Sequence, residues 1–456
     1  MYLHETETEF PVDAGRGSIL EQVSSGLGRH ISDDEMPVRI VVAESTGGRY
    51  KCEVALLRNH RDLAPSLRAS VLRFRKRLIE NSQAFNAVLL VPTGVGAEIG
   101  GHAGDATPVA TLLASICDTL ITHPNVLNGS DLIDISPNTL YVEGSAISRL
   151  LMGSIGLQPV RSNRVLVVVD AHQDEFFVDA AINAVHAARS SYGLICPMIL
   201  RLEPPLDMRS QYMDSGRVGG TVEGIDRLVA NLNDHRRSYD AVAISSVIAV
   251  PLSYHIDYFE SDGNMLNPWG GVEAMLTHTI STLFDVPSAH SPMLENQEIA
   301  NMETGVVDPR MAAEAISLTF MQSVLKGLQR SPKIVTGPEA MAHHGVLTAS
   351  DVSCLVIPDG CLGLPTLAAL EQGIPVIAVR ENRTVMKNDL TLLPWAPGQF
   401  HPVANYWEAA GVMAALKAGI DPKAVRRPIT QTTVRTSTAP VSSIPESVAI
   451  GPTADD

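Results

Sequence analysis

The sequence predicts an α/β protein with two Rossmann-like lobes built on mostly parallel sheets. Short segments such as AVLLVP (87–92) and RVLVVVD (164–170) are apolar at nearly every position, as strands buried on both faces are. Helical stretches separate these segments along the chain, and this alternation is typical of a parallel sheet covered by helices. A length of 456 residues is sufficient for two or three hydrophobic cores.

The strands expected in chain order divide into two groups. PVRIVVAE (37–44) and KCEVALLR (51–58) flank Gly47-Gly48, a pair that favours a hairpin. With further strands at 87–92, 164–170 and 194–202, they make residues 37–202 the first lobe. Strands at 240–250, 333–337, 354–358 and 375–379 make residues 240–395 the second lobe.

The segments outside the two lobes lack a periodic apolar pattern. Residues 1–36 are polar and are expected to form an extended lead-in. Pro204-Pro205 and Gly219-Gly220 interrupt residues 203–239, which we expect to be a linker. Residues 396–456 form a C-terminal segment, with disorder expected from about residue 426, where Thr, Ser, Pro and Ala dominate.

Composition excludes several classes of function. Lys and Arg number 34 and Asp and Glu number 50, so the formal charge is −16, which disfavours binding to nucleic acid or to an anionic membrane. The five cysteines are far apart and predict neither disulfides nor a structural zinc site. The N-terminal MYLHETETEF does not resemble a signal peptide, so we expect a cytoplasmic location. The sequence indicates no particular cofactor and leaves a homo-oligomer open.

The strongest candidate site is the loop VPTGVGAEIGGHAGDATP (91–108), which follows a buried strand and precedes a helix. Glycines let backbone N–H groups approach a carboxylate or phosphate, and the helix N-terminus adds partial positive charge. Asp105 and Thr107 are placed to cap that helix. The alternative is a tight connection with no ligand, since the loop matches neither the P-loop nor the dinucleotide pattern. The glycines concerned are Gly94, Gly96, Gly100, Gly101 and Gly104.

Two further loops contain residues suited to acid–base chemistry. Asp170 and His172, in VDAHQDE (169–175), follow the strand at 164–170 and could transfer protons, with capping of the next helix as the alternative. In the polar loop at 254–273, Asn267, Trp269 and Gly270 would bind a substrate and Glu273 would act as acid or base. The alternative there is a surface loop anchored by a buried Trp269.

The turn after the strand at 354–358 contains Gly360 and Cys361. A cysteine before a helix N-terminus is placed where a thiolate is stabilised, although a small buried residue is the commoner explanation. Other polar residues are expected to make local hydrogen bonds rather than to bind a ligand; they are His123, Asn125, Glu143, His290 and Glu295.

The stretch VPTGVGAEIGGHAGDATPVATLLASICDTLITHPNVLN (91–128) resembles a family of uncharacterised proteins from bacteria and photosynthetic organisms, classed as a domain of unknown function. LYVEGSAISRLL, NPWGGVEAML and DGCLGLPTLAALEQGIPVIAVREN extend the likeness over most of residues 37–395. The resemblance implies that these loops form one site, and it implies no reaction. Residues 357–385 are also similar to the nucleotide-binding turn of two-lobed glycosyltransferases and nucleotide-sugar epimerases, with Leu364-Pro365-Thr366 where those have an acidic pair.

These observations together predict an enzyme that acts on a small anionic metabolite, a carboxylate or phosphate, as a lyase, isomerase or hydrolase of a biosynthetic pathway. The glycine loop would hold the anion, and the residues expected to carry the chemistry are Asp105, Asp170, His172, Glu273 and Cys361. Two alternatives remain. One is a nucleotide-sugar enzyme of the two-lobed kind, and the other is a metabolite-binding protein without catalysis.

Overall fold

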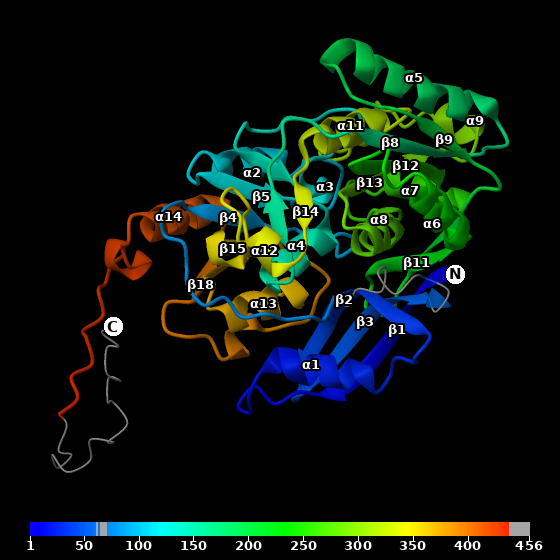
Figure 1. The fold of residues 1–456 in the computed structure, drawn as a ribbon. Coiled ribbons are helices and arrows are strands. Elements are labelled where there is room, and N and C mark those ends of the chain that lie inside the picture. Colours follow the sequence, from blue (N-terminus) through cyan, green and yellow to red (C-terminus); the bar gives the residue numbers. More distant parts are fainter. Residues whose placement is uncertain (61–62, 64–70, 437–456) are drawn as a thin grey trace, which may run out of the picture.

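The computed structural model describes residues 1–60, 63 and 71–436. Within this part of the chain the strands form two parallel sheets, one antiparallel sheet and one short two-stranded ribbon (Figure 1). Helices lie between and around the parallel sheets. The predicted α/β fold is therefore confirmed.

The large parallel sheet has the strand order β18-β17-β15-β4-β5-β6. Its strands are Asn86–Leu89 (β4), Thr119–Thr122 (β5), Thr139–Tyr141 (β6), Val352–Pro358 (β15), Val376–Val379 (β17) and Phe400–Val403 (β18). From β4 the chain continues through α2 (Thr107–Ala114) to β5, whereas from β15 it continues through α13 (Leu364–Gln372) to β17 on the other side. Open α/β sheets bind ligands outside the carboxyl ends of two such diverging neighbours.

The small parallel sheet has the order β13-β12-β8-β9 and repeats this arrangement. Its strands are Val165–Asp170 (β8), Ile199–Leu202 (β9), Ala241–Val247 (β12) and Ser288–Met293 (β13). α5 (Glu175–Tyr192) connects β8 to β9, and α7 (Leu252–Glu260) and α8 (Gly270–Phe284) connect β12 to β13. One buried hydrophobic cluster contains Leu89 of the large sheet and Val167 of the small sheet, so the two sheets share a core.

The antiparallel sheet has the order β10-β11-β1-β3-β2-β16. Its strands are Tyr2–Pro11 (β1), Glu35–Thr46 (β2), Arg49–Arg58 (β3), Asp207–Tyr212 (β10), Val218–Glu223 (β11) and Leu362–Gly363 (β16). β2 and β3 form the predicted hairpin, and Gly47 and Gly48 at its tip have φ angles of +58° and +73°. Positive φ at both positions suits the twist of a two-residue hairpin turn.

Two segments expected to lack regular structure are folded, so those predictions are wrong. Residues 1–36 contain β1, the start of β2 and α1 (Ile19–Gly28), and β1 lies between β3 and β11. One of the glutamates that make β1 look exposed, Glu5, has a buried side chain and pairs with the buried Arg217. Residues 203–239, the expected linker, contain β10, β11 and α6 (Ile225–Asp234).

The two expected lobes are interleaved along the chain. Residues 37–202 and residues 240–395 each contribute strands to both parallel sheets. The remaining elements are α3 (Pro124–Leu127), α4 (Gly144–Leu151), α9 (Gln297–Ala300), α10 (Ala312–Ala315), α11 (Met321–Arg330), α12 (Pro338–Met341) and α14 (Tyr406–Lys417), with β7 (Gly156–Gln158) and β14 (Lys333–Val335) forming the ribbon.

The expected disordered tail lies largely outside the described residues, which end at residue 436. Residues 426–436 contain no helix or strand. No helix in the described part of the chain combines the length and the apolarity needed to cross a membrane.

Candidate functional site

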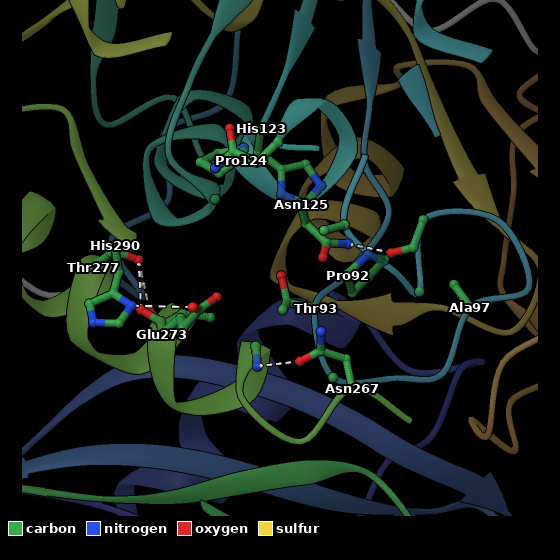
Figure 2. A pocket seen from close by; sticks show the side chains of 18 of the residues that line it. Pro92, Thr93, Ala97, His123, Pro124, Asn125, Asn267, Glu273, Thr277 and His290 are labelled. Carbon is green, nitrogen blue, oxygen red and sulfur yellow. Dashed lines mark hydrogen bonds and ion pairs between the residues drawn. The ribbon is translucent and has the colours of Figure 1, made fainter. Parts of the chain in front are cut away.

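A central cavity lies at the carboxyl end of β4, where the large sheet diverges. Figure 2 shows Thr93, Asn125, Asn267 and Glu273 around it. Seven residues singled out from the sequence line this cavity: Gly94, Gly96, Gly100, Gly101, Asn267, Gly270 and Glu273. The glycine loop and the loop before α8, which are far apart in the chain, therefore meet at one site.

Helix α8 forms one wall of the central cavity. Glu273, Ala274, Thr277 and His278 line it, and their spacing places them on one face of the helix. The other faces pack against α4, β2, β11 and β13, so α8 is buried almost all round (Figure 1). A helix enclosed in this way holds its polar side chains rigidly at the cavity wall.

The first titratable pair in the wall joins α8 to α4. Nδ1 of His278 lies 2.5 Å from Oε1 of Glu143, which is buried at the start of α4. Oε2 of Glu143 accepts hydrogen bonds from the backbone N–H groups of Ser145 (2.9 Å) and Ala146 (3.3 Å). Burial alone would raise the pKa of Glu143, but His278 and these donors outweigh it and hold that pKa below its ordinary value. Glu143 is therefore a carboxylate that orients His278.

The second pair joins α8 to β13. Nδ1 of His290 lies 3.2 Å from Oε1 of Glu273 (Figure 2). Nε2 of His290 lies 2.8 Å from the hydroxyl oxygen of Ser246. Both ring nitrogens of His290 are thus occupied. The side chain of Glu273 is 27% exposed, and its Oε2 has no hydrogen-bond partner among the described residues. In this pair the histidine positions the carboxylate, which faces the cavity.

His123 contributes a third, neutral imidazole. Its Nε2 accepts a hydrogen bond of 3.1 Å from the N–H of Val91, so the ring proton lies on Nδ1. Burial lowers the pKa of His123 to about 3. The neighbouring Asn125 donates to the carbonyls of Val91 and Gly100 and so fixes the glycine loop.

The glycines of the loop allow neighbouring groups to come close to the backbone, and they allow the backbone to turn. Gly94 and Gly96 have φ angles of +75° and +61°, and a Cβ atom at Gly96 would lie 2.8 Å from Leu266. In the described part of the chain, the N–H groups of Gly96, Ala97 and Gly101 donate to no protein acceptor. The loop therefore lines the cavity with N–H donors that an anion can use.

Two neighbouring cavities adjoin the central one. The first, the Cys361 chamber, shares Thr93, His123 and His278 with it and is lined also by Arg39. The guanidinium of Arg39 donates to the carbonyls of Thr93 and Gly271, and although burial lowers its pKa to about 10, it stays cationic at neutral pH. Burial raises the pKa of Cys361 to about 12, so its thiol stays protonated, which argues against the predicted nucleophile.

The second neighbour, the aromatic chamber, is lined by Trp269, Phe259, Phe320, Met293 and Leu294. It shares Glu273 and His290 with the central cavity. Trp269 therefore lies beside the cavity and does not line it. Asn267 accepts from the N–H groups of Trp269 (2.9 Å) and Gly270 (3.1 Å), and these bonds shape the start of α8.

Four other predicted residues lie behind or beside the cavity wall. Asp105 accepts from the N–H of Gly100 (2.9 Å), and burial raises its pKa to about 7. No side chain caps α2, because Asp105 bonds within the loop and the hydroxyl of Thr107 donates to the carbonyl of Val126. Gly104 packs against Gly129, and Gly360 turns the chain before the Cys361 chamber.

Asp170 and His172 line neither the central cavity nor its two neighbours. Asp170 is buried and accepts from the N–H of Leu206 (3.1 Å), and burial raises its pKa to about 7. His172 bonds the N–H of Asp174 and the carbonyl of Leu294. Asp170 and His172 therefore bond to the segments at Leu206 and Leu294, and it is Asp174, not Asp170, that caps the next helix.

The residues described contain no group of three or more His, Cys, Asp or Glu side chains arranged to hold a metal ion. Four titratable side chains of the central cavity form two His–Glu pairs, and His102 and His123 line the cavity without a Glu partner among the described residues. Such pairs suit proton transfer.

Sequence reasoning missed several residues of the cavity. Glu143, His290 and His123 were expected to make local bonds only, and Arg39 and His278 were not singled out. One signal was available: Glu273 and His278 are the two titratable residues of GGVEAMLTHTISTLF (270–284), whose other residues are apolar, glycine or hydroxyl-bearing. Polar residues in a buried helix need partners and often mark a site.

Comparison with known proteins agrees with the resemblance noted in the sequence. Residues 86–426 match the family described as "Protein of unknown function (DUF3326)". A protein of Synechococcus sp. named an uncharacterized lipoprotein is 34% identical over 350 residues, which cover 75% of this chain and 94% of that protein. No solved structure matches the chain. The chain belongs to the DUF3326 family.

Proposed function

We propose that the protein is an enzyme of small-molecule metabolism that binds a small anionic metabolite in the central cavity. It acts on this metabolite by acid–base chemistry, as a lyase, isomerase or hydrolase. The observation that carries the proposal is the presence of two His–Glu pairs, His278–Glu143 and His290–Glu273, at the wall of one cavity.

The two pairs have different roles in the proposal. Glu143 faces Nδ1 of His278, which leaves Nε2 of that ring to give or take the substrate's proton. In the other pair both nitrogens of His290 are occupied, so the free oxygen of Glu273 is the second proton-transfer atom. One group removes a proton from the substrate while the other returns one, and proton exchange with water then restores both groups for the next cycle.

The anion has two sources of stabilisation in the proposal. The N–H groups of Gly96, Ala97 and Gly101 offer hydrogen bonds to a carboxylate or phosphate. Arg39, beside Thr93, supplies a buried positive charge that makes no ion pair with another described residue. Both features favour an anionic ligand over a neutral one.

We place the enzyme in the cytoplasm, because all five cysteines are free in the structure. The name of the Synechococcus relative, a lipoprotein, favours attachment to a membrane instead. Fractionation of cells that produce the chain, followed by immunoblotting, decides between the two. Recovery in the membrane fraction that survives a salt wash would contradict the cytoplasmic assignment.

The function is tested in two steps with purified protein. A thermal-shift screen of small carboxylates and phosphate monoesters identifies ligands, since binding to the native state raises the melting temperature. Each ligand found is then incubated with the protein in D₂O, and NMR spectroscopy follows deuterium incorporation and conversion.

We expect exchange or conversion with the wild type and a loss of about 100-fold or more in Glu273→Gln. Glu273→Gln keeps the shape of the side chain and should still bind the ligand. A ligand that binds but undergoes neither exchange nor conversion would support a binding protein without catalysis. A thermal shift with nucleotide sugars alone would support the two-lobed nucleotide-sugar class.

A further inference from the structure

We infer that the anionic ligand carries a flat apolar body, such as an aromatic ring system, and that this body occupies the aromatic chamber. The inference rests on the proposed function, because the central cavity must hold the anionic end. It specifies the class of substrate as a carboxylic acid or phosphate ester with an apolar ring close to the charged group.

Thirteen of the 24 residues that line the aromatic chamber are apolar. Among them are Ile248, Phe259, Trp269, Met293, Leu294 and Phe320. Trp269 is held in place by Tyr258, whose ring lies perpendicular at 5.4 Å, and by His255 at 5.2 Å. A fixed indole offers a flat surface on which a ring can stack, and methionine adapts to its outline.

Two of the three carboxylates of the chamber are engaged by protein partners, and the third, Glu273, is the proton-transfer group of the proposed function. Glu295 pairs with His255 (3.5 Å) and accepts from the N–H of Val250 (3.0 Å). Glu314 accepts from the N–H of Ala103 (2.7 Å) and from Nδ2 of Asn267 (3.2 Å). Because these groups are satisfied internally, the surface that remains for a ligand is mainly the apolar one.

The chamber adjoins the reactive part of the central cavity. Glu273 and His290 line both spaces, together with Ala103, Asn128 and Asn267. A ligand whose anion lies at the glycine loop therefore passes Glu273 before its remaining part enters the chamber. The bond that reacts then lies between the charged group and the ring.

The inference is tested by comparing probes with and without a ring. Acetate and inorganic phosphate represent the anion alone, naphthylacetate and naphthyl phosphate represent the anion with a ring, and naphthalene methanol represents the ring alone. We expect the matching ring-bearing anion to bind the wild type at least about 100-fold more tightly than the bare anion, because the ring leaves water. Whether the carboxylate or the phosphate series shows this gain identifies the anionic group.

Ala315→Trp fills the chamber, since Ala315 lines it. This change should remove the gain from the ring and leave binding of the bare anion unaltered. Ala312→Trp, at the exposed start of the same helix α10, is the matched control and should change neither. Melting curves of both variants verify that they fold.

The outcomes separate this inference from the proposed function. Equal affinity of the wild type for acetate and naphthylacetate, and for phosphate and naphthyl phosphate, overturns the inference and needs no variant. A ring gain that persists in folded Ala315→Trp overturns it as well. Failure of every anionic probe to bind contradicts the proposed function itself.

Discussion

The loops that follow β4 and β8 begin at corresponding positions in the two parallel sheets. Of these two loops, the one after β4 lines the central cavity. After β8 the polar groups have protein partners: Asp170 accepts from the N–H of Leu206, His172 bonds the carbonyl of Leu294, and Asp174 caps α5. After β4 the loop contributes backbone N–H groups and His102, and the other acids and histidines of the cavity come from α4, α8, β13 and the start of α3. Polar residues beside a strand end therefore indicate a site only when the rest of the fold leaves polar atoms there without partners.

The largest expected effect is on substrate turnover, and it should separate His278, at the central cavity, from His172, after β8. His278→Gln should lower the turnover of a substrate by about 10²–10⁴-fold, because Gln cannot carry the proton. His172→Gln should leave turnover within about twofold, since both ring nitrogens of His172 hold local backbone. The initial rate of deuterium exchange or conversion measures both. Equal losses in the two variants would remove the distinction between the regions.

The second prediction concerns the pH dependence of stability at the end of β8. The folded pKa of Asp170, about 7, exceeds its ordinary value of 3.8, so its stabilising contribution is complete below about pH 4 and is lost as pH rises through 7. The amide side chain in the variant Asp170→Asn does not ionise. At pH 8 the variant should therefore be more stable than the wild type by up to about 4 kcal/mol of unfolding free energy, and it should unfold at a higher temperature.

The gain in unfolding free energy from Asp170→Asn should fall toward zero at pH 4. Melting curves at pH 4, 6 and 8 provide the measurement, and turnover should be unaffected because Asp170 lies outside the cavity. A stability difference that does not change with pH would contradict the titration of Asp170.

A smaller effect is expected at the start of α5. Oδ1 of Asp174 accepts from the N–H of Phe176 (3.0 Å), so Asp174→Ala should cost about 1 kcal/mol of unfolding free energy. Asp174→Ser keeps a capping oxygen and should cost only a few tenths of about 1 kcal/mol of unfolding free energy. Urea unfolding distinguishes the two. A loss of turnover in folded Asp174→Ser would return this loop to the list of candidate sites.

The smallest expected effect is at Cys361. Its pKa of about 12 leaves almost no thiolate at pH 8, so iodoacetamide should not modify it in the folded protein. Peptide mass spectrometry after labelling, with and without urea, reports this directly. Cys361→Ala should keep turnover within about twofold, and rapid labelling of the native protein would reverse the assignment.

Much of the fold followed from local patterns in the sequence. The apolar run at 87–92 and the glycines after it predicted a strand and a loop at a site, and Gly47-Gly48 predicted the hairpin. β1 was missed because its glutamates look exposed, and the burial of one of them, Glu5, depends on the distant Arg217.

The candidate site was predicted in part, for a related reason. Glu273 and Asn267 lie in a loop with evident polar character, whereas Glu143 and His278 gain their meaning only from each other. The two residues belong to segments that adjoin different strands, and no local pattern indicates that α4 and α8 pack together. Pairing across such a distance is determined by tertiary packing, which a single sequence does not display.

The pairing of β4 with β15 at the centre of the large sheet bears on how the chain is made. Asn86 pairs with Val352, so the small sheet and most of the antiparallel sheet are synthesised before β4 obtains its second neighbour. Until then β4 presents an unpaired strand edge to the cell, and such edges recruit other chains. The part of the chain before β15 and the part from β15 onward are therefore not independent folding units. We expect a chain that ends before β15 to be prone to aggregation.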